Sequence, residues 1–377
     1  MKLVHFSDTH LGYSEGTKID TDTGINLREA DTYKAFSRVV DHIAQLKPDL
    51  ILHSGDLFDN PRPSNRTINF TLREIKRISK LDIPFVLISG NHSTPRVRTS
   101  GSIFESFALF DNIYPVYGLA YQEIKINGIS IHCLPHMLTE QEMQRTLNKL
   151  KPNPRSDANI IVAHVGITAE TQYKMGEFNE QLVPYSTLAK KRNFDYIALG
   201  HYHRNVKLAD NAYYAGSTER FSFDDATQDK GFVIANLNKG DLDVKFIPIE
   251  VRGMFLVEPI DCTDLTLHEI LKRFEERINN KVKDKIVLIT LANLSRHKYV
   301  ELDFAKMKEL TSQAAYVKFD YQLVTEGGEP VARTAIGTLT TEFESFLARQ
   351  KIRDLSKARL KEMGVDYLSK VILPEEI

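Results

Sequence analysis

Short apolar runs alternate with segments of helical periodicity along roughly the first 250 residues of the chain. Strand-like runs occupy residues 3–7, 49–53, 85–89, 159–163 and 196–199. Between the first two runs, apolar side chains recur every three or four positions from Tyr33 to Leu46. This spacing predicts a helix of about 20 residues with one apolar face.

Two β-hairpins are also predicted. Residues 122–133 alternate around Asn127 and Gly128, a dipeptide that favours a tight turn. A second hairpin is expected to join residues 231–237 to residues 242–249. Strands and helices in alternation, together with these hairpins, predict a layered α/β sandwich with mixed sheets.

The pattern changes after residue 250. Residues 254–324 follow a β-α-β-α-β order that predicts a small α+β domain. Residues 325–330 (TEGGEP) have the composition of a linker, and helices are expected over 340–350 and 353–363. We therefore expect three parts, at residues 1–250, 251–330 and 331–377.

Composition narrows the class of protein. The chain has 377 residues, of which 42% are hydrophobic and 26% charged, and these are ordinary globular values. Its two cysteines, Cys133 and Cys262, exclude a disulfide scaffold and a zinc–thiolate site. With no leader-like start and no membrane-length apolar run, a soluble cytoplasmic protein is expected. The net charge of −1 excludes a polycation but not a nucleic-acid-binding protein, because binding depends on local clusters.

Polar side chains follow each strand-like run, where α/β sheets place their ligand sites. They are Asp8, His10, Asp56, Asn91, His92, His164, His201 and His203. Glycines directly precede three of these segments and allow tight turns after the strands.

The residue types indicate a metal site. Carboxylate, imidazole and amide oxygen without thiolate suit Mn²⁺, Fe²⁺ or Zn²⁺. These ligands are too many for one ion but fit two ions that share a carboxylate. Two such ions, about 3.5–4 Å apart, can bind a phosphoryl group between them. Each short motif arises easily by chance, but all of them in order indicate metal-assisted phosphoester hydrolysis.

Taken together, the motifs around these residues resemble the calcineurin-like metallophosphoesterase superfamily. More narrowly, SDTHLGY (7–13), SGDLFDNPRPS (54–64) and GSTER (216–220) resemble the SbcD-type double-strand-break repair nucleases. The resemblance covers residues 1–250 by motif and 251–330 by architecture. It implies a layered α/β/β/α metallophosphoesterase sandwich with a small α+β capping domain and C-terminal helices.

The resemblance also implies a role for each matched residue. One metal would be held by Asp8, His10, Asp56 and His203. The other would be held by Asp56, Asn91, His164 and His201, with Asp56 bridging. His92 would be the general acid. The family further implies two Mn²⁺ per chain (Fe²⁺ or Zn²⁺ as alternatives), exonuclease and endonuclease action on DNA, a homodimer, a coiled-coil ABC-type ATPase partner bound through residues 331–377, and association with the nucleoid.

Asp59 lies three residues after Asp56 and is expected to pair with His92 and raise the pKa of that imidazole. The alternative is a turn or helix-capping role for Asp59. One departure from the family is Ser93, where an acidic residue usually follows the GNH motif. That position is not a matched ligand.

Four arginines in loops beside the predicted site are candidates for binding DNA phosphates: Arg62, Arg66, Arg96 and Arg98. Solvated loop charge is an equally good interpretation of each one. The apolar run at residues 103–110 suits either core packing or a contact between two copies of the chain. Two rival functions stay open: another phosphodiesterase or phosphatase of the same superfamily, and a non-catalytic DNA-end-tethering scaffold.

Overall fold

The computed structural model describes residues 1–94, 101–168, 180–238, 241–278 and 281–324, together with scattered positions between 347 and 364. Arg96, Arg98, the predicted linker and nearly all of residues 331–377 lie outside the described residues. Within the described part, no helix has the length and apolarity needed to cross a bilayer.

The described residues before residue 250 form two six-stranded sheets and one two-stranded sheet. The first has the order β14-β13-β1-β2-β3-β4, in which β1 to β4 run parallel, β13 pairs antiparallel with β1, and β14 pairs antiparallel with β13. Its strands are β1 (Lys2–Phe6), β2 (Leu50–His53), β3 (Phe85–Ile88), β4 (Ile113–Val116), β13 (Gly231–Asn238) and β14 (Asp241–Pro248).

The second sheet has the order β11-β12-β10-β7-β6-β5. Its strands are β5 (Gln122–Ile126), β6 (Ile129–Leu134), β7 (Ala158–His164), β10 (Tyr196–Gly200), β11 (Val206–Ala209) and β12 (Ala212–Tyr214). The predicted hairpin at Asn127 and Gly128 joins β5 to β6, and both residues have positive φ, 48° and 82°. Such angles suit a tight hairpin turn, which agrees with the sequence. A two-stranded sheet is formed by β8 (Gly166–Thr168), which directly follows β7 in the sequence, and β9 (Leu182–Pro184).

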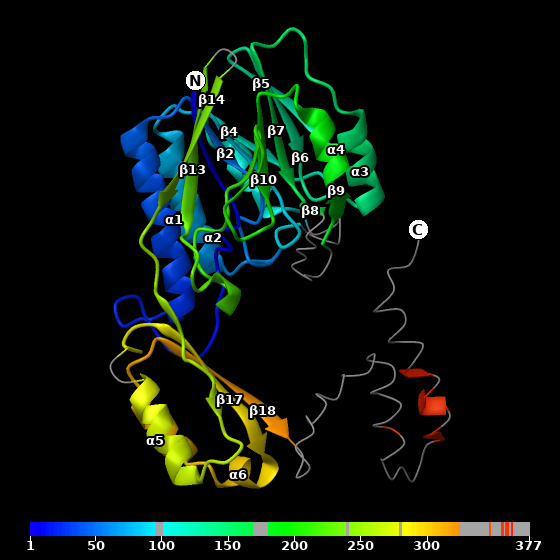
Figure 1. Cartoon of the computed structure of the whole chain (residues 1–377). Coiled ribbons are helices and arrows are strands. Elements are labelled where there is room, and N and C mark those ends of the chain that lie inside the picture. The colour runs from blue at the N-terminus through cyan, green and yellow to red at the C-terminus, as the bar shows by residue number, and fades with distance from the viewer. Residues whose placement is uncertain are drawn as a thin grey trace. The chain divides into compact units, whose positions relative to one another are not determined.

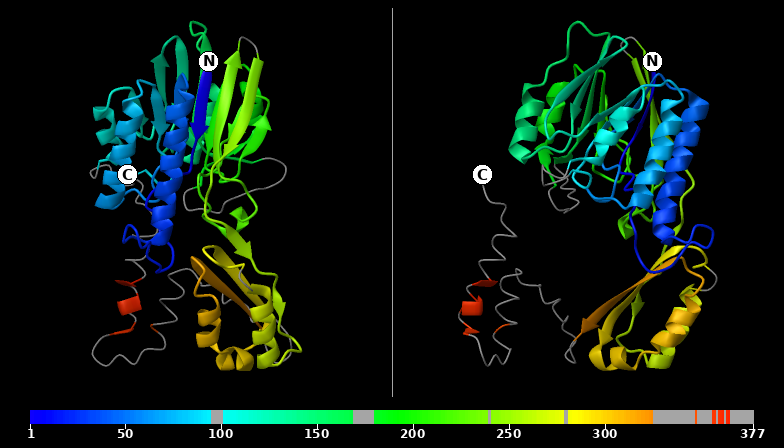
Figure 2. Two further views of the ribbon diagram at one scale, coloured as in Figure 1. Left: turned by 90° about the vertical axis from the view of Figure 1, so that its left-hand side faces the viewer. Right: turned by 180° about the vertical axis from the view of Figure 1, so that it is seen from behind.

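Helices cover the outer faces of both sheets. The helices on the first sheet are α1 (Leu27–Leu46) and α2 (Asn65–Ser79), and those on the second are α3 (Glu140–Lys149) and α4 (Tyr185–Leu188). The 3₁₀ helices are η2 (Ile103–Leu109), η3 (Ala189–Lys191) and η4 (Phe223–Asp225). Figure 1, and the view from behind in Figure 2, show the two sheets between these helix layers. The predicted α/β/β/α sandwich is confirmed.

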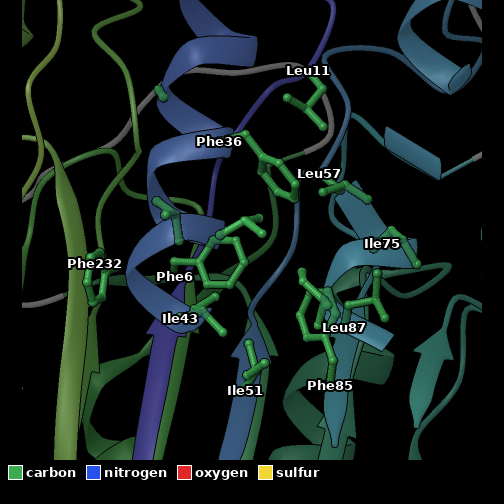
Figure 3. Packing of buried hydrophobic residues seen from close by; sticks show 14 of the residues in the cluster. Phe6, Leu11, Phe36, Ile43, Ile51, Leu57, Ile75, Phe85, Leu87 and Phe232 are labelled. Carbon is green, nitrogen blue, oxygen red and sulfur yellow. The ribbon is translucent and has the colours of Figure 1, made fainter. Parts of the chain in front are cut away.

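Alternation along the strands supplies three apolar layers. In β2, Ile51 packs toward α1 and α2, whereas Leu50 and Leu52 pack between the two sheets. This is the two-residue period of a strand buried on both faces. Figure 3 shows the outer layer, where Phe6 and Phe36 from β1 and α1 pack together. Two aromatic side chains of η2 also belong to this core, since Phe104 and Phe107 are buried against Phe58, whereas Leu109 is 85% exposed.

After residue 254 the elements follow the order β-β-α-β-α-α-β, which differs from the predicted β-α-β-α-β order by a first strand divided into two and an additional short helix, α6. They are β15 (Met254–Leu256), β16 (Ile260–Asp261), α5 (Leu267–Ile278), β17 (Ile286–Ser295), α6 (Arg296–Glu301), α7 (Phe304–Leu310) and β18 (Tyr316–Val324). The chain divides into two compact units, one of Met1–Glu258, Glu275–Ile289 and Ala305–Phe319, the other of Pro259–Phe274, Thr290–Phe304 and Asp320–Ile377. The three-part division by function stays a prediction.

A buried histidine links the two sheets of the sandwich. His5 in β1 is fully buried, with Nε2 2.8 Å from Ser54 Oγ and Nδ1 3.0 Å from Tyr196 Oη of β10. Burial lowers the pKa of His5 to about 3, so the imidazole is neutral in the folded protein at physiological pH.

We expect acid to destabilise the fold through His5. Between its folded pKa of about 3 and the ordinary 6.5, the unfolded chain binds a proton that the folded chain does not, so stability falls as pH falls through this window. The full effect of this one group is up to about 5 kcal/mol. His5→Gln should be less stable than wild type at pH 7, and its deficit should shrink toward pH 4. Urea unfolding midpoints of both metal-free proteins across this range test it, and a constant deficit contradicts it.

Candidate metal centre

The candidate site lies at the carboxyl ends of parallel strands from both sheets. Asp8 and His10 follow β1, Asp56 follows β2, and Asn91 and His92 follow β3. From the second sheet, His164 ends β7, and His201 and His203 follow β10. All six of the carboxylate and imidazole ligands predicted from the sequence are buried, with 6% or less of each residue exposed. Loops after parallel strands gather at one edge of a sheet, which brings these residues together.

The backbone is strained at the site. Asp8, His10, Asp56 and His201 have φ of 51°, 41°, 52° and 106°, although none is glycine. Hydrogen bonds between the first two loops hold this conformation, since Asp8 N donates to Gly55 O (3.0 Å) and Thr9 N to Asp56 O (2.9 Å). Such strain costs of order 1–3 kcal/mol per residue and clusters at functional sites.

Three glycines make room for the site. A Cβ at Gly55 would lie 2.1 Å from His164 Nδ1, and one at Gly90 would lie 2.3 Å from Asp56 Oδ1. At Gly200 the Cβ would lie 2.1 Å from the main-chain oxygen of Ser54. These contacts explain why glycine precedes the polar residue in each motif: the strand ends approach too closely for a side chain.

Among the described residues, three groups of side chains have ligand atoms close enough to hold an ion, and two of them consist entirely of predicted ligands. In the first group, ligand atoms of Asp8, His10 and His203 lie within 4.8 Å of one another, with Nε2 of His10 and His203 3.2 Å apart. Asp8, Asp56 and His164 form the second group. The two groups share Asp8, whereas the sequence predicted Asp56 as the shared residue; the bridging role of Asp56 stays a prediction.

The second group is completed by an amide. His164 Nε2 lies 3.0 Å from Asp56 Oδ2 and 2.9 Å from Asn91 Oδ1, so carboxylate, imidazole and amide oxygen converge. His201, the fourth predicted ligand here, has its ring 5.4 Å from that of His164, and its main-chain N donates to Asp8 Oδ1 at 3.1 Å.

Electrostatics show that the site suits cations. Burial raises the pKa of Asp8, and the nearby charge of Asp56 raises it further. Burial alone would raise the pKa of Asp56 too, but His164 and His10 outweigh it and hold this pKa well below its usual range. Two buried carboxylates among imidazoles, with oxygen and nitrogen donors and no thiolate, fit Mn²⁺, Fe²⁺ or Zn²⁺.

His164 carries a proton in the metal-free site. Burial would lower its pKa, but Asp56 outweighs burial and raises the pKa of His164 to about 9. A metal ligand must be deprotonated, so ion binding here would release that proton. The Nδ1 atom lies 2.9 Å from the main-chain oxygen of Ser54, which orients the ring and leaves Nε2 toward the cluster.

The structure brings His92 and Asp59 together through a different atom from the one predicted. His92 Nδ1 lies 3.0 Å from the main-chain oxygen of Asp59, and His92 N donates to Asp56 Oδ1 at 2.9 Å. The Asp59 carboxylate instead lies 3.4 Å from His10 Nδ1. A ligand atom of each of His10, Asp59 and His92 falls within 4.8 Å of the others, so Asp59 borders both imidazoles.

The departure at residue 93 has a structural role. Ser93 is 1% exposed, its hydroxyl donates to Phe58 O at 3.3 Å, and Phe58 N donates back to the same hydroxyl at 3.3 Å. The side chain therefore ties the loop after β3 to the loop after β2. A carboxylate at this buried position would add negative charge beside Asp56.

Of the predicted DNA-binding arginines, two are described. Arg62 is exposed, and Arg66 is 56% exposed with Nη1 3.4 Å from Glu29 Oε2. Both positions are open to a ligand. Arg96 and Arg98 lie outside the described residues.

Sequence reasoning missed three residues around the ligands. They are Glu180, whose Oε1 lies 3.0 Å from His201 Nε2, and the buried pair Asp225 and Lys230. Lys230 Nζ donates to Asp225 Oδ1 (2.7 Å) and to His203 O (2.8 Å). None of the three follows a strand of the parallel set, so the strand-end rule could not find them.

Comparison with known proteins decides the family. A family model described as "Calcineurin-like phosphoesterase" matches residues 1–205. The chain belongs to this family. The match confirms the predicted superfamily and the predicted enzyme class, a metal-dependent phosphodiesterase.

Full-length relatives support the narrower resemblance. The chain is 28% identical over 337 residues to the "DNA double-strand break repair protein Mre11" of Methanocaldococcus jannaschii, covering 85% of this chain and 84% of that one. It is 29% identical over 396 residues to the protein of the same name from Sulfurisphaera tokodaii, covering 98% and 97%. The Sulfolobus acidocaldarius protein of that name is 26% identical, covering 75% and 73%. These relatives confirm the resemblance to the repair nucleases.

Proposed function

We propose that this chain is a two-metal DNA nuclease that hydrolyses phosphodiester bonds at DNA ends, as an exonuclease and an endonuclease, in double-strand-break repair. The proposal rests on one observation: Asp8, Asp56 and the imidazoles form two adjoining groups, each with ligand atoms close enough to hold one ion. Similarity along nearly the whole chain to proteins named for DNA double-strand break repair supports DNA as the substrate.

The metal ligands and His92 have different proposed roles in catalysis. When bound, two Mn²⁺ ions supply Lewis acidity toward phosphoryl oxygens and a more acidic water. Asp8 and Asp56, whose side chains are buried, would hold the ions. In its protonated form, His92 donates a proton to the leaving sugar oxygen, because an alkoxide is a poor leaving group. The main-chain oxygen of Asp59 fixes the ring for that task.

The proposal includes partners. A homodimer and a coiled-coil ABC-type ATPase subunit are implied by the family resemblance, and residues 331–377 are the proposed attachment segment. Arg62 and Arg66 are proposed to contact DNA phosphates, since both guanidinium groups lie in or beside the loop that follows Asp56.

End-labelled duplex DNA and bis-p-nitrophenyl phosphate, each with Mn²⁺, test the proposal. We expect Mn²⁺-dependent cleavage of the duplex. Turnover of the small diester alone would favour another phosphodiesterase of the superfamily. Binding of DNA without cleavage under Mn²⁺, Fe²⁺ or Zn²⁺ would favour a tethering scaffold.

We expect His92 and Asp59 to have separable effects. His92→Gln should lower DNA cleavage by about 10²-fold or more with Mn²⁺ binding unchanged, because it removes proton donation only. Asp59→Asn keeps the main-chain oxygen that His92 contacts but alters the contact with His10. It should therefore weaken Mn²⁺ binding and recover most activity at high Mn²⁺.

Mn²⁺ titrations and single-turnover cleavage rates distinguish these outcomes. If Asp59→Asn matched His92→Gln, with full metal occupancy and slow cleavage, the carboxylate would act on His92 after all.

A further inference from the structure

Glu180 contacts one of the predicted ligand histidines from outside the metal groups. Its Oε1 lies 3.0 Å from Nε2 of His201, and the two side chains are 8% and 2% exposed. A carboxylate buried beside an imidazole in this geometry accepts the ring N–H. With Nε2 engaged in this way, Nδ1 is the nitrogen of His201 with its lone pair available to a metal.

The segment that carries Glu180 is anchored through the next residue, by both its side chain and its main chain. Glu180 directly precedes Gln181, whose side chain donates from Nε2 to Met137 O (2.7 Å) and accepts from Met137 N (3.3 Å). The main-chain oxygen of Gln181 accepts from Gly166 N at 2.9 Å, next to the β8–β9 pairing. These hydrogen bonds fix the backbone on which the carboxylate stands.

The neighbouring strand leaves space for this carboxylate. A Cβ on Gly166 would lie 3.3 Å from Glu180 Oε1 and 2.9 Å from Tyr202 Oη. The absence of a side chain at Gly166 therefore lets Glu180 reach His201 beside a buried tyrosine.

We propose that Glu180 is a positioning residue: it orients His201 with Nδ1 toward the metals and strengthens binding of one of the two ions. The inference rests on the proposed two-metal function. His201 belongs to the predicted ligand set of His164 and Asn91, and the other imidazole of that set, His164, is oriented by a neutral main-chain oxygen. At His201 the corresponding partner is a carboxylate, that of Glu180.

The effect is on affinity. Carboxylates that accept from a ligating histidine raise its basicity, and losing one costs about 10- to 100-fold in metal affinity. Glu180→Gln keeps an oxygen acceptor but removes the charge, whereas Glu180→Ala removes both. We expect both variants to bind one Mn²⁺ as tightly as wild type and the second about 10- to 100-fold more weakly, with the larger loss in Glu180→Ala.

Glu140→Gln is the matched control. Glu140 Oε2 accepts from the main-chain N of Leu182 at 3.1 Å, so this carboxylate supports the same short segment without contacting a histidine. The glutamine retains an acceptor for that bond. A structural effect on β9 would therefore appear in both the Glu140 and the Glu180 variants, whereas an effect through His201 would appear only in the latter.

The experiment is an equilibrium titration of the full chain with Mn²⁺, with free Mn²⁺ measured by its electron paramagnetic resonance signal. Cleavage of labelled duplex at rising Mn²⁺ and thermal unfolding in chelator accompany it. The expected result is a selective loss of the second equivalent in Glu180→Gln, a higher Mn²⁺ requirement, near-normal cleavage at saturation, and unfolding like wild type. Glu180→Gln keeps the test decisive if Glu180→Ala fails to fold.

Three results separate failure of this inference from failure of the proposed function. If wild type binds two Mn²⁺ ions and Glu180→Gln binds both with the same affinities, the proposed role of Glu180 is overturned. Equal losses in Glu140→Gln and Glu180→Gln overturn it as well. Wild type that binds no Mn²⁺ and cleaves no DNA overturns the proposed function itself.

Discussion

Replacing Asp56 by asparagine is expected to abolish Mn²⁺-dependent cleavage. Asp56 Oδ2 lies 3.0 Å from His164 Nε2, and Oδ1 accepts from His92 N at 2.9 Å. Asparagine keeps the shape and an oxygen for the His92 N–H but removes the charge that metal binding needs. We expect a loss of about 10³-fold or more, which is at least about 4 kcal/mol of transition-state stabilisation.

Asp49→Asn is the control for this variant. Asp49 is exposed and immediately precedes β2, at the end of the strand opposite Asp56. It should leave both metal binding and cleavage unchanged. Cleavage rates and the number of bound Mn²⁺ ions check the prediction. If Asp56→Asn still bound two ions and cleaved at the wild-type rate, Asp56 would not be a metal ligand.

Gly55→Ala should destroy the site by crowding alone. The new Cβ would lie 2.1 Å from His164 Nδ1 and 2.5 Å from its Cγ, and the residue has φ of 108°. His164 must then leave its contact with Ser54 O, so we expect loss of Mn²⁺ binding together with destabilisation. The backbone term is about 1–2 kcal/mol, and the displaced ring adds to it.

Gly24→Ala separates these causes. Gly24 also has positive φ, 68°, but a Cβ there meets nothing within 4 Å. It should show the backbone cost without any loss of metal. Unfolding midpoints and Mn²⁺ titrations of the two variants make the comparison. Equal behaviour of both variants would mean that Gly55 matters only for its backbone angle.

The parts of the fold that are local in sequence could be predicted. The apolar period from Tyr33 to Leu46 predicted the helix that became α1, and Asn127-Gly128 predicted the β5–β6 turn. Polar residues after strands could also be assigned to one site, because parallel strands end at a common edge. Each of these signals lies within one segment of a few residues to a few turns.

The contacts around the ligands could not be predicted, because they depend on how separate segments pack. Glu180 reaches His201 only through the β8–β9 pairing and the space at Gly166. The spacing of Asp56 and Asp59 placed Asp59 near His92, but it could not show that the main-chain oxygen makes the contact while the carboxylate faces His10.

The two sheets contribute ligands to the same ion groups, and this has a consequence for assembly. Asp8 and Asp56 come from the first sheet, whereas His164 and His203 come from strands more than 100 residues later. Neither sheet alone presents a complete group, so on the proposed function we expect a nascent chain to capture its ions only after both sheets have docked. Metal binding would then depend on completed folding. An ion held by ligands from both sheets would in turn stabilise their docked arrangement, since a ligand that binds only the native state stabilises that state. Scarcity of the metal in the cell would then shorten the lifetime of the folded protein as well as lower its activity.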